Sequence, residues 1–317
     1  SSDVCSSDLN ENHGIYLIDS EENTISNNII GLSSSCDLLI PNESNGIEFS
    51  NSNKNVIGGK KFIDANGNIN NPTGNKGTVP PTFVRPLEGN IISGNKANGI
   101  ELKYSSYNKM YGNFIGTDCL GLLNFGNKLN GINLSLNSNF NVISGCGVDS
   151  NPFIYYNVIG WNKKNGVQID SSNYTTIQGN FIGCNYDNLN PAPNFNGLVI
   201  LGTSKFTVVG GPIPLGNVIS GNLNNGIYLT DDINGFDSIN TFCGLVAFGA
   251  ELPNKNGITV DSNASTIRLN TNVISGNYEN GINIKGKSNN IIITSNIIGL
   301  NTQGTTPLPN YKSGIVI

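Results

Sequence analysis

Histidine, arginine and charge in general are scarce in this sequence. His13 is the only histidine among 317 residues, the only arginines are Arg85 and Arg268, and charged residues make up 12%. Because His13 alone is available, in a turn-like position, no Ser/His/Asp or Cys/His nucleophile is expected. The 17 lysines and arginines are scattered and the net charge is −5, so we expect no nucleic-acid partner.

Helical periodicity is missing as well. No stretch shows the spacing of an amphipathic helix, which argues against βαβ units, and no membrane segment is apparent. The combination of low charge and abundant Asn could indicate disorder. A strict apolar periodicity along the chain excludes that interpretation.

This periodicity is a tenfold repeat, in which a glycine is followed by an apolar–any–apolar triplet. The glycines are Gly14, Gly46, Gly99, Gly131, Gly166, Gly197, Gly226, Gly257, Gly281 and Gly314, and Asn precedes eight of them. The Asn-Gly step favours a turn, and alternate residues of a strand face the same side. Each repeat therefore predicts a short strand with two inward apolar side chains.

The intervals between the glycines contain two further short strand-like pieces, bounded by Asn and Gly, as in 90–95 and 176–183. One coil is thus three short strands, and parallel stacking of such coils gives a β-solenoid. The predicted fold class is all-β, a right-handed parallel β-helix of about ten coils. The sequence resembles the pectin-lyase-like group of right-handed parallel β-helix proteins over residues 10–317.

Short and long connections into the repeated glycine alternate along the chain. The long ones follow Ile-Gly or Phe-Gly, as in 32–45 and 117–130. We expect long loops on one edge of the solenoid at every second coil, roughly every 10 Å. Asn residues in successive corners should stack into hydrogen-bonded ladders that satisfy buried turn amides.

The two ends of the chain interrupt the repeat. Residues 1–9 look like a translated sequencing adapter, and we expect this segment to be artefactual or disordered. Residues 10–317 should form a single β-helix domain. Because Asn10 enters the repeat without its preceding strand and Ile317 ends within one, we expect a fragment truncated at both ends.

Enzymes on the fold that this sequence resembles carry their sites on outward strand faces and adjoining loops. Glu48 and Glu101 are outward residues of adjacent coils, about 5 Å apart, within the range of a retaining glycosidase pair. Tyr16 and Lys103 share this face, and an insertion at 59–88 brings Arg85. Glu48, Glu101 and Arg85 are the catalytic candidates; the alternative is an exposed, solvated Glu pair balanced by Lys103.

The sequence gives little indication of a metal site or of a lyase active site. A lyase would need acidic residues gathered for calcium and a basic residue, but Arg85 and Arg268 are far apart in the repeat. Asp170 and Asp261 are three coils apart, roughly 14 Å. The stretch 64–68 alternates oxygen ligands but lacks the downstream bidentate Glu of a calcium loop. We predict no metal site and no cofactor, with calcium left open.

The cysteines leave the redox compartment open. None shows the C-x-x-C spacing of a metal site. Cys36, Cys119 and Cys184 fall in successive long loops, but at different offsets from the preceding glycine. A disulfide between neighbouring loops is one possibility.

Three functions are compatible with these patterns. The first is a non-catalytic, secreted or surface β-helix, acting as a scaffold or adhesin. Its partner would be a polysaccharide or cell-surface glycan, bound along the long loops and the outward faces through Tyr16, Lys103, Gln168 and Tyr228. The alternative is a polysaccharide lyase or glycoside hydrolase acting near Glu48 and Glu101. A third is a passive spacer. We expect an extracellular or cell-surface location.

Overall fold

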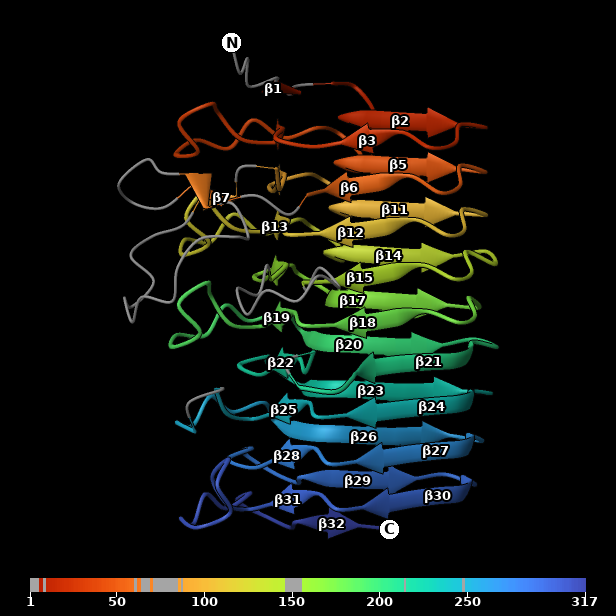
Figure 1. Cartoon of the computed structure of the whole chain (residues 1–317), viewed down its shortest axis with the longest axis vertical. Helices are drawn as coiled ribbons and strands as arrows, with labels where there is room; N and C mark the ends of the chain where they lie inside the picture. The colour runs from red at the N-terminus through yellow and green to blue at the C-terminus, as the bar shows by residue number, and fades with distance from the viewer. Residues whose placement is uncertain are drawn as a thin grey trace.

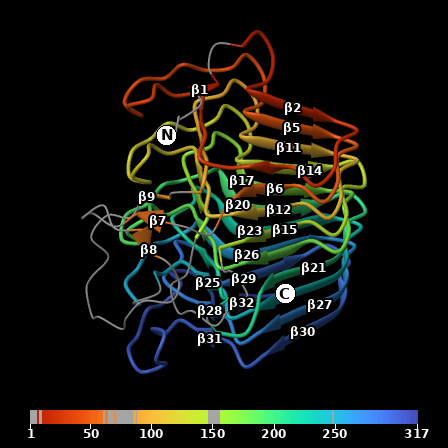
Figure 2. The same cartoon turned by 45° about the horizontal axis from the view of Figure 1, so that its top comes forward.

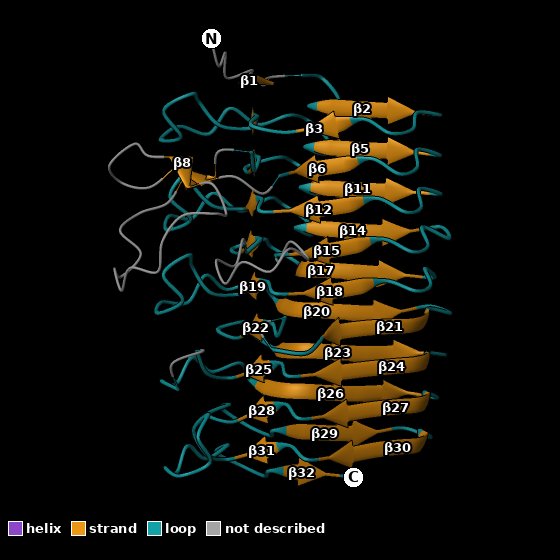
Figure 3. Cartoon of the chain, in the orientation of Figure 1, coloured by secondary structure: helices purple, strands orange, loops and turns teal. Residues whose placement is uncertain are grey.

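The computed structural model describes residues 10–59, 88–145, 156–213, 215–246 and 249–317, with four short strands at 6–7, 62–63, 69–70 and 85–86. Three long parallel sheets run the length of the molecule, and the described residues contain no helix (Figures 1 and 3). Each coil contributes one strand to each sheet. The prediction of a right-handed parallel β-helix with about ten coils is confirmed.

We name the sheets A, B and C. Sheet A contains β1 (Ser6–Ser7), β4 (Ile29–Ile30), β10 (Ile91–Ile92), β13 (Phe114–Ile115), β16 (Val158–Ile159), β19 (Phe181–Ile182), β22 (Val218–Ile219), β25 (Phe242–Cys243), β28 (Val273–Ile274) and β31 (Ile297–Ile298). Sheet B contains β2 (Ile15–Ile18), β5 (Ile47–Ser50), β11 (Ile100–Lys103), β14 (Ile132–Ser135), β17 (Asn165–Asp170), β20 (Asn196–Leu201), β23 (Asn225–Asp231), β26 (Asn256–Ser262), β29 (Ile282–Lys285) and β32 (Ile315–Val316).

Sheet C contains β3 (Thr24–Ile25), β6 (Val56–Gly58), β12 (Lys109–Tyr111), β15 (Val142–Ser144), β18 (Thr176–Gln178), β21 (Lys205–Gly210), β24 (Asn234–Ile239), β27 (Ser265–Asn270) and β30 (Asn289–Thr294). The chain passes from sheet B to C to A within each coil. A small antiparallel sheet is formed by β7 (Phe62–Ile63), β8 (Ile69–Asn70) and β9 (Arg85–Pro86).

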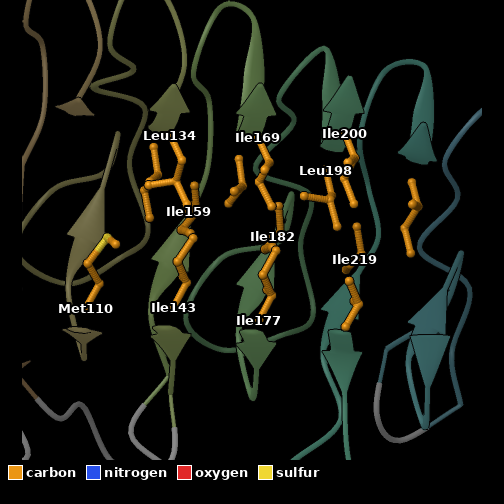
Figure 4. Close-up of a cluster of buried hydrophobic side chains, with 14 of the residues drawn as sticks. Met110, Leu134, Ile143, Ile159, Ile169, Ile177, Ile182, Leu198, Ile200 and Ile219 are labelled. Atoms are coloured by element: carbon orange, nitrogen blue, oxygen red, sulfur yellow. The ribbon is translucent and has the colours of Figure 1, made fainter. Parts of the chain in front are cut away.

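The core is a column of apolar side chains enclosed by the three sheets. From Ile47 to Ile282, every inward residue that the repeat predicts is buried. Figure 4 shows three rows of these side chains, one from each sheet; they include Leu134, Ile169 and Ile200 of sheet B, Met110, Ile143 and Ile177 of sheet C, and Ile159, Ile182 and Ile219 of sheet A. In the last strand Ile315 is exposed, because no further coil of this chain covers it.

The corners between the sheets are held by ladders of Asn side chains. In the ladder before sheet B, each Nδ2 donates to the Oδ1 of the next coil at 2.8–3.2 Å. Its members are Asn10, Asn42, Asn95, Asn127, Asn162, Asn194, Asn222, Asn254, Asn277 and Asn310. A second ladder before sheet A runs from Asn28 to Asn217, and Thr241 interrupts it. The predicted Asn stacking is confirmed.

Long loops occur at every second coil and leave the solenoid on the side of sheet A (Figures 1 and 2). Each folds back on itself through one antiparallel bridge; the bridges are Leu32–Leu39, Thr117–Asn124, Cys184–Pro191, Leu245–Glu251 and Leu300–Pro307. The first two loops are joined by a disulfide between Cys36 and Cys119. The differing sequence offsets of these cysteines therefore do not keep the two thiols apart.

We expect the replacement Asn162→Ala to destabilise the solenoid strongly. Asn162 is buried; its Oδ1 accepts from the Asn127 amide groups, and its Nδ2 donates to Asn194. Losing these partners leaves buried donors unsatisfied and should lower the free energy of unfolding by about 3 kcal/mol. Denaturant unfolding measures this effect. Asn289→Ala, at an exposed strand position, is the control and should change it by less than about 0.5 kcal/mol.

Opening the disulfide should also lower stability. Cys36 and Cys119 are separated by 83 residues, and closing such a loop in the unfolded chain is worth about 4 kcal/mol. The double variant Cys36→Ser/Cys119→Ser should therefore melt at a lower temperature than the oxidised wild type. Peptide mapping of the native protein should recover the Cys36–Cys119 pair.

Burial raises the pKa of Cys243 to about 12, so this thiol should resist alkylation. Alkylation of Cys36 and Cys119 in the unreduced protein would contradict the pairing.

Candidate functional site

The outer face of sheet B carries the predicted site residues in one register. Tyr16 of β2 pairs with Glu48 of β5, Glu48 with Glu101 of β11, and Glu101 with Asn133 of β14. These four residues point away from the core because their neighbours on each strand, one position before and after, point into it. The fold therefore brings the two glutamates side by side, as the repeat predicts.

Glu48 is held by three basic or amide groups. Its Oε1 accepts from Lys103 Nζ at 2.8 Å, and its Oε2 accepts from Asn45 Nδ2 at 2.6 Å. His13 Nδ1 lies 3.5 Å from the same Oε2. The His13 ring also stands 4.9 Å from the ring of Tyr16. His13 therefore occupies the Asn position of the repeat and contacts the carboxylate of the next coil.

Glu101 is bonded only to neutral donors. Asn98 Nδ2 donates to its Oε2 at 2.6 Å, and Ser135 Oγ donates to its Oε1 at 2.9 Å. Asn133 Nδ2 contacts both oxygens, at 3.0 and 2.9 Å. The carbonyl oxygen of Asn133 is buried without a partner.

The two glutamates occupy different electrostatic environments. Burial raises the pKa of Glu101 above its ordinary value; the hydrogen bonds from Asn133 and Ser135 only partly oppose this. Burial works against the charge of Lys103, but its hydrogen bond to Glu48 and the two carboxylates together raise its pKa. Burial also lowers the pKa of His13, against the opposing charge of Glu48. Glu101, whose pKa is raised, thus lies beside the hydrogen-bonded Lys103–Glu48 pair.

The structure corrects the expectation of a solvated Glu pair. Glu48 and Glu101 each expose only 4% of their surface, although both project from the outer face. Their own corner residues Asn45 and Asn98 reach over them, and Lys103 bridges the strands. Tyr16, by contrast, is 46% exposed. The two glutamates are therefore buried, with hydrogen bonds to all four of their carboxyl oxygens, next to an exposed tyrosine.

The remaining predicted residues lie further along the same face. Gln168 of β17 accepts from Asn165 Nδ2, and Tyr228 of β23 contacts Asp261 through its hydroxyl at 3.3 Å. Six coils separate Tyr228 from Tyr16, roughly 29 Å. Gln168 and Tyr228 are thus in line with the glutamates but outside their cluster. The Arg85 side chain and the insertion residues Lys60, Lys61 and Asp64 lie outside the described residues.

Sequence reasoning missed a surface feature at the corner between sheets B and C. Tyr107, Phe140, Tyr174 and Phe206 stack on one another with ring centroids 4.9, 4.7 and 5.0 Å apart and planes inclined by 3°, 0° and 18°. All four are exposed, between 41% and 52%. We call this row the aromatic ladder. The signal was present in the sequence, as aromatic residues 33, 34 and 32 positions apart, each preceding Asn or Thr.

Two further features concern metals and membranes. Within the described ranges, no three His, Cys, Asp or Glu residues come together as metal ligands. The alternating stretch 64–68, considered for calcium, lies outside those ranges. In the part of the chain that the structure describes, no helix has the length and apolarity needed to cross a membrane.

Comparison with known proteins relates the chain to others by fold alone. No protein-family model matches it, and no curated protein matches it by sequence. Among solved structures, a point mutant of the periplasmic alginate epimerase AlgG has a TM-score of 0.49 at 14% identity, with 95% of this chain and 70% of that chain covered. Dettilon tailspike protein has a TM-score of 0.42 at 12% identity, covering 91% and 57%. The Azotobacter vinelandii mannuronan C-5 epimerase AlgE6 A-module has 0.28 at 13%, covering 89% of each. The chain is a right-handed parallel β-helix protein, and at these identities the likeness extends to the fold.

The raised pKa of Glu101 predicts how stability depends on pH. Because the folded chain binds this proton more tightly than the unfolded chain, the contribution of Glu101 to stability falls as pH rises from the ordinary Glu value through the raised one. Glu101→Gln should therefore gain stability relative to wild type as pH rises from the ordinary Glu value through the raised pKa.

Urea unfolding at several pH values measures this difference. The matched control is Glu279→Gln, since the hydrogen bond from Lys312 lowers the pKa of Glu279. Relative to wild type, Glu279→Gln should lose stability as pH rises from the lowered pKa of Glu279 to the ordinary Glu value, and its relative stability should stay level above that value. A Glu101→Gln variant that loses stability relative to wild type as pH rises would contradict the assignment.

Proposed function

We propose that this chain is a non-catalytic β-helix scaffold of the secreted or cell-surface type, which binds a glycan along its outer faces and long loops. The observation that carries the proposal is that the two outward glutamates are buried and hydrogen-bonded. Glu48 and Glu101 are buried and bonded on both oxygens, so they act as fixed supports of a polar surface.

The engagement of both glutamates in hydrogen bonds supports the non-catalytic part. A general acid or base must come within hydrogen-bonding reach of the substrate proton. Glu48 is engaged by Lys103 and Asn45, and Glu101 by Asn98, Asn133 and Ser135. A substrate would have to displace several of these bonds before either carboxyl could react.

The outer face of sheet B supports the binding part. Tyr16, Gln168 and Tyr228 stand on strands, which fix side chains more rigidly than loops do. Tyrosine offers an apolar ring with a hydroxyl, and amides both donate and accept hydrogen bonds. These groups match the C–H faces and the hydroxyls of sugars. The Cys36–Cys119 disulfide supports an extracellular location, since disulfides persist in oxidising compartments.

A second candidate function is a carbohydrate-active enzyme, and one observation favours it. Two adjacent carboxyl groups with different protonation environments are the pattern of a paired acid and base. In this alternative, Glu101 would donate a proton and Glu48 would act as nucleophile or base. Lys103 and Asn45 would hold Glu48 in position.

A binding and turnover assay separates the two functions. The protein is tested against acidic and neutral polysaccharides, with and without calcium, by affinity electrophoresis and by assays for reducing ends and unsaturated products. We expect retention without turnover, weakened about tenfold in Tyr16→Ala or Tyr228→Ala. Ile292→Ala, an exposed residue of β30, is the control and should bind as wild type. Turnover that Glu101→Gln abolishes would establish the enzyme instead, and absence of any binding would refute the scaffold proposal.

A further inference from the structure

The aromatic ladder occupies a backbone position that ordinarily disfavours large side chains. The φ angles of Tyr107, Phe140, Tyr174 and Phe206 are 61°, 56°, 57° and 55°. Glycine or Asn adopts this left-handed conformation at lower cost. Equivalent corners of the other coils carry Glu22, Lys54, Gly235, Thr266 and Asn290. Four consecutive coils nevertheless place an exposed aromatic ring here.

Mutual stacking leaves part of each ring available. Centroid separations of 4.7–5.0 Å between parallel rings exceed the 3.5–4.0 Å of direct carbon contact, so the rings are offset. A strip of each face and the outer edge therefore remain open to solvent. The hydroxyls of Tyr107 and Tyr174 make no hydrogen bond within the described residues. The ladder thus presents the exposed edges of four offset rings and the two free hydroxyls of Tyr107 and Tyr174.

A groove and a row of β-branched side chains lie beside the ladder. The groove is lined by Lys54, Val56, Tyr107, Lys109 and Phe140. Outward residues of sheet C continue the row past it, in the register Val142, Thr176 and Val208. All three are partly exposed. The ladder and this row together form one stripe parallel to the solenoid axis.

Within coils two to six, the charge carried by this stripe is of one sign, although acidic residues border it at both ends. Lys54 pairs with Glu21 and Glu22 of coil one, and Asp231 of coil seven accepts from the backbone N–H of Gly202. In coils two to six, the segments that form the corner and sheet C contain no Asp or Glu, although the chain has 22 of them; the segments are 51–59, 104–116, 136–145, 171–183 and 202–213. Their charged residues are Lys54, Lys109 and Lys205, all exposed. Within the described residues, Lys109 and Lys205 have no acidic partner. A protein of net charge −5 therefore presents a cationic aromatic stripe.

We propose that the aromatic ladder is a binding site for an acidic polysaccharide that lies along the solenoid axis. The open ring strips would contact the C–H groups of the sugars, and the free hydroxyls of Tyr107 and Tyr174 would bond their hydroxyls. Lys109 and Lys205 would pair with carboxylate or sulfate groups. This inference rests on the proposed glycan-binding function and assigns it a surface separate from the outer face of sheet B.

The geometry favours a glycan over two other occupants. Bases of single-stranded nucleic acid stack on open aromatic faces, whereas the ring faces of the ladder are partly covered by one another. Each nucleotide also carries a phosphate, whereas the five coils of the stripe contain only three lysines. A second copy joined by a twofold axis would place this acid-free stripe against itself, lysine facing lysine. An acidic polysaccharide could bind such a surface, because its carboxylate or sulfate groups can pair with spaced lysines and its C–H groups can contact the exposed ring edges.

Affinity electrophoresis in polygalacturonate, dextran sulfate and neutral hydroxyethylcellulose tests the inference. Tyr107→Ala/Tyr174→Ala should weaken retention by the acidic polymers at least tenfold. Lys109→Gln/Lys205→Gln should weaken it several-fold and flatten its dependence on salt. Neither variant should change retention by the neutral polymer. Ile292→Ala is the matched surface control, and circular dichroism checks that each variant is folded.

The outcomes separate this inference from the function on which it rests. Acidic binding that survives the ladder variants but is lost in Tyr16→Ala overturns the ladder site and leaves the glycan-binding scaffold intact. Failure of the wild type to bind any polysaccharide overturns both. If the wild type binds an oligothymidylate more tightly than the acidic polysaccharides, the ligand is a nucleic acid and the inference is overturned. A wild-type dimer in sedimentation that the ladder variants dissociate assigns the stripe to a second copy, and also overturns the inference.

Discussion

The structure depends on satisfying the peptide groups at the corners of each coil. Along the strands, backbone groups pair with the coils above and below, but at a corner the chain turns away from the sheet while remaining buried. An unpaired buried peptide group costs as much as a lost hydrogen bond. The Asn ladders satisfy these groups. The Oδ1 of each Asn accepts from the backbone N–H and the Nδ2 of the Asn in the preceding coil, and its own Nδ2 donates to the Oδ1 in the next coil. The low charge and high Asn content of the chain follow from this requirement.

Regular corners give a regular surface. Because every coil repeats the same turns, an outward position recurs at the strand spacing, and a column of side chains on the outside is as well ordered as the core. The register Tyr16–Glu48–Glu101–Asn133 and the aromatic ladder are two such columns. A binding site on this fold is therefore a row of groups along the axis, which suits an extended polymer better than a compact ligand.

The sequence reveals the period but not the surroundings of each outward residue. Alternation after each repeated glycine was enough to predict that Ile47 and Phe49 are buried and that Glu48 points outward. It did not predict that Glu48 is covered, because its cover comes from Asn45 of its own corner and Lys103 of the next coil. The aromatic ladder was equally hard to find. Its members lie at the corners between sheets B and C, and their spacing of 33, 34 and 32 residues gains meaning only once these corners are known to stack on one edge of the solenoid.

Side chains at the outer corners can change without disturbing the fold. At the position of the aromatic ladder, other coils carry Glu22, Lys54, Gly235 and Asn290, yet the strands on either side keep their register. The backbone conformation there is imposed by neighbouring coils and by the ladders beneath, so no particular side chain is needed to maintain it. Residues that recur at such a position over several coils are therefore better explained by what they contact outside the solenoid, or by one another, than by folding. Mutual stacking accounts for the alignment of the four rings, whereas the recurrence of exposed aromatic residues in four consecutive coils is left for a ligand to explain.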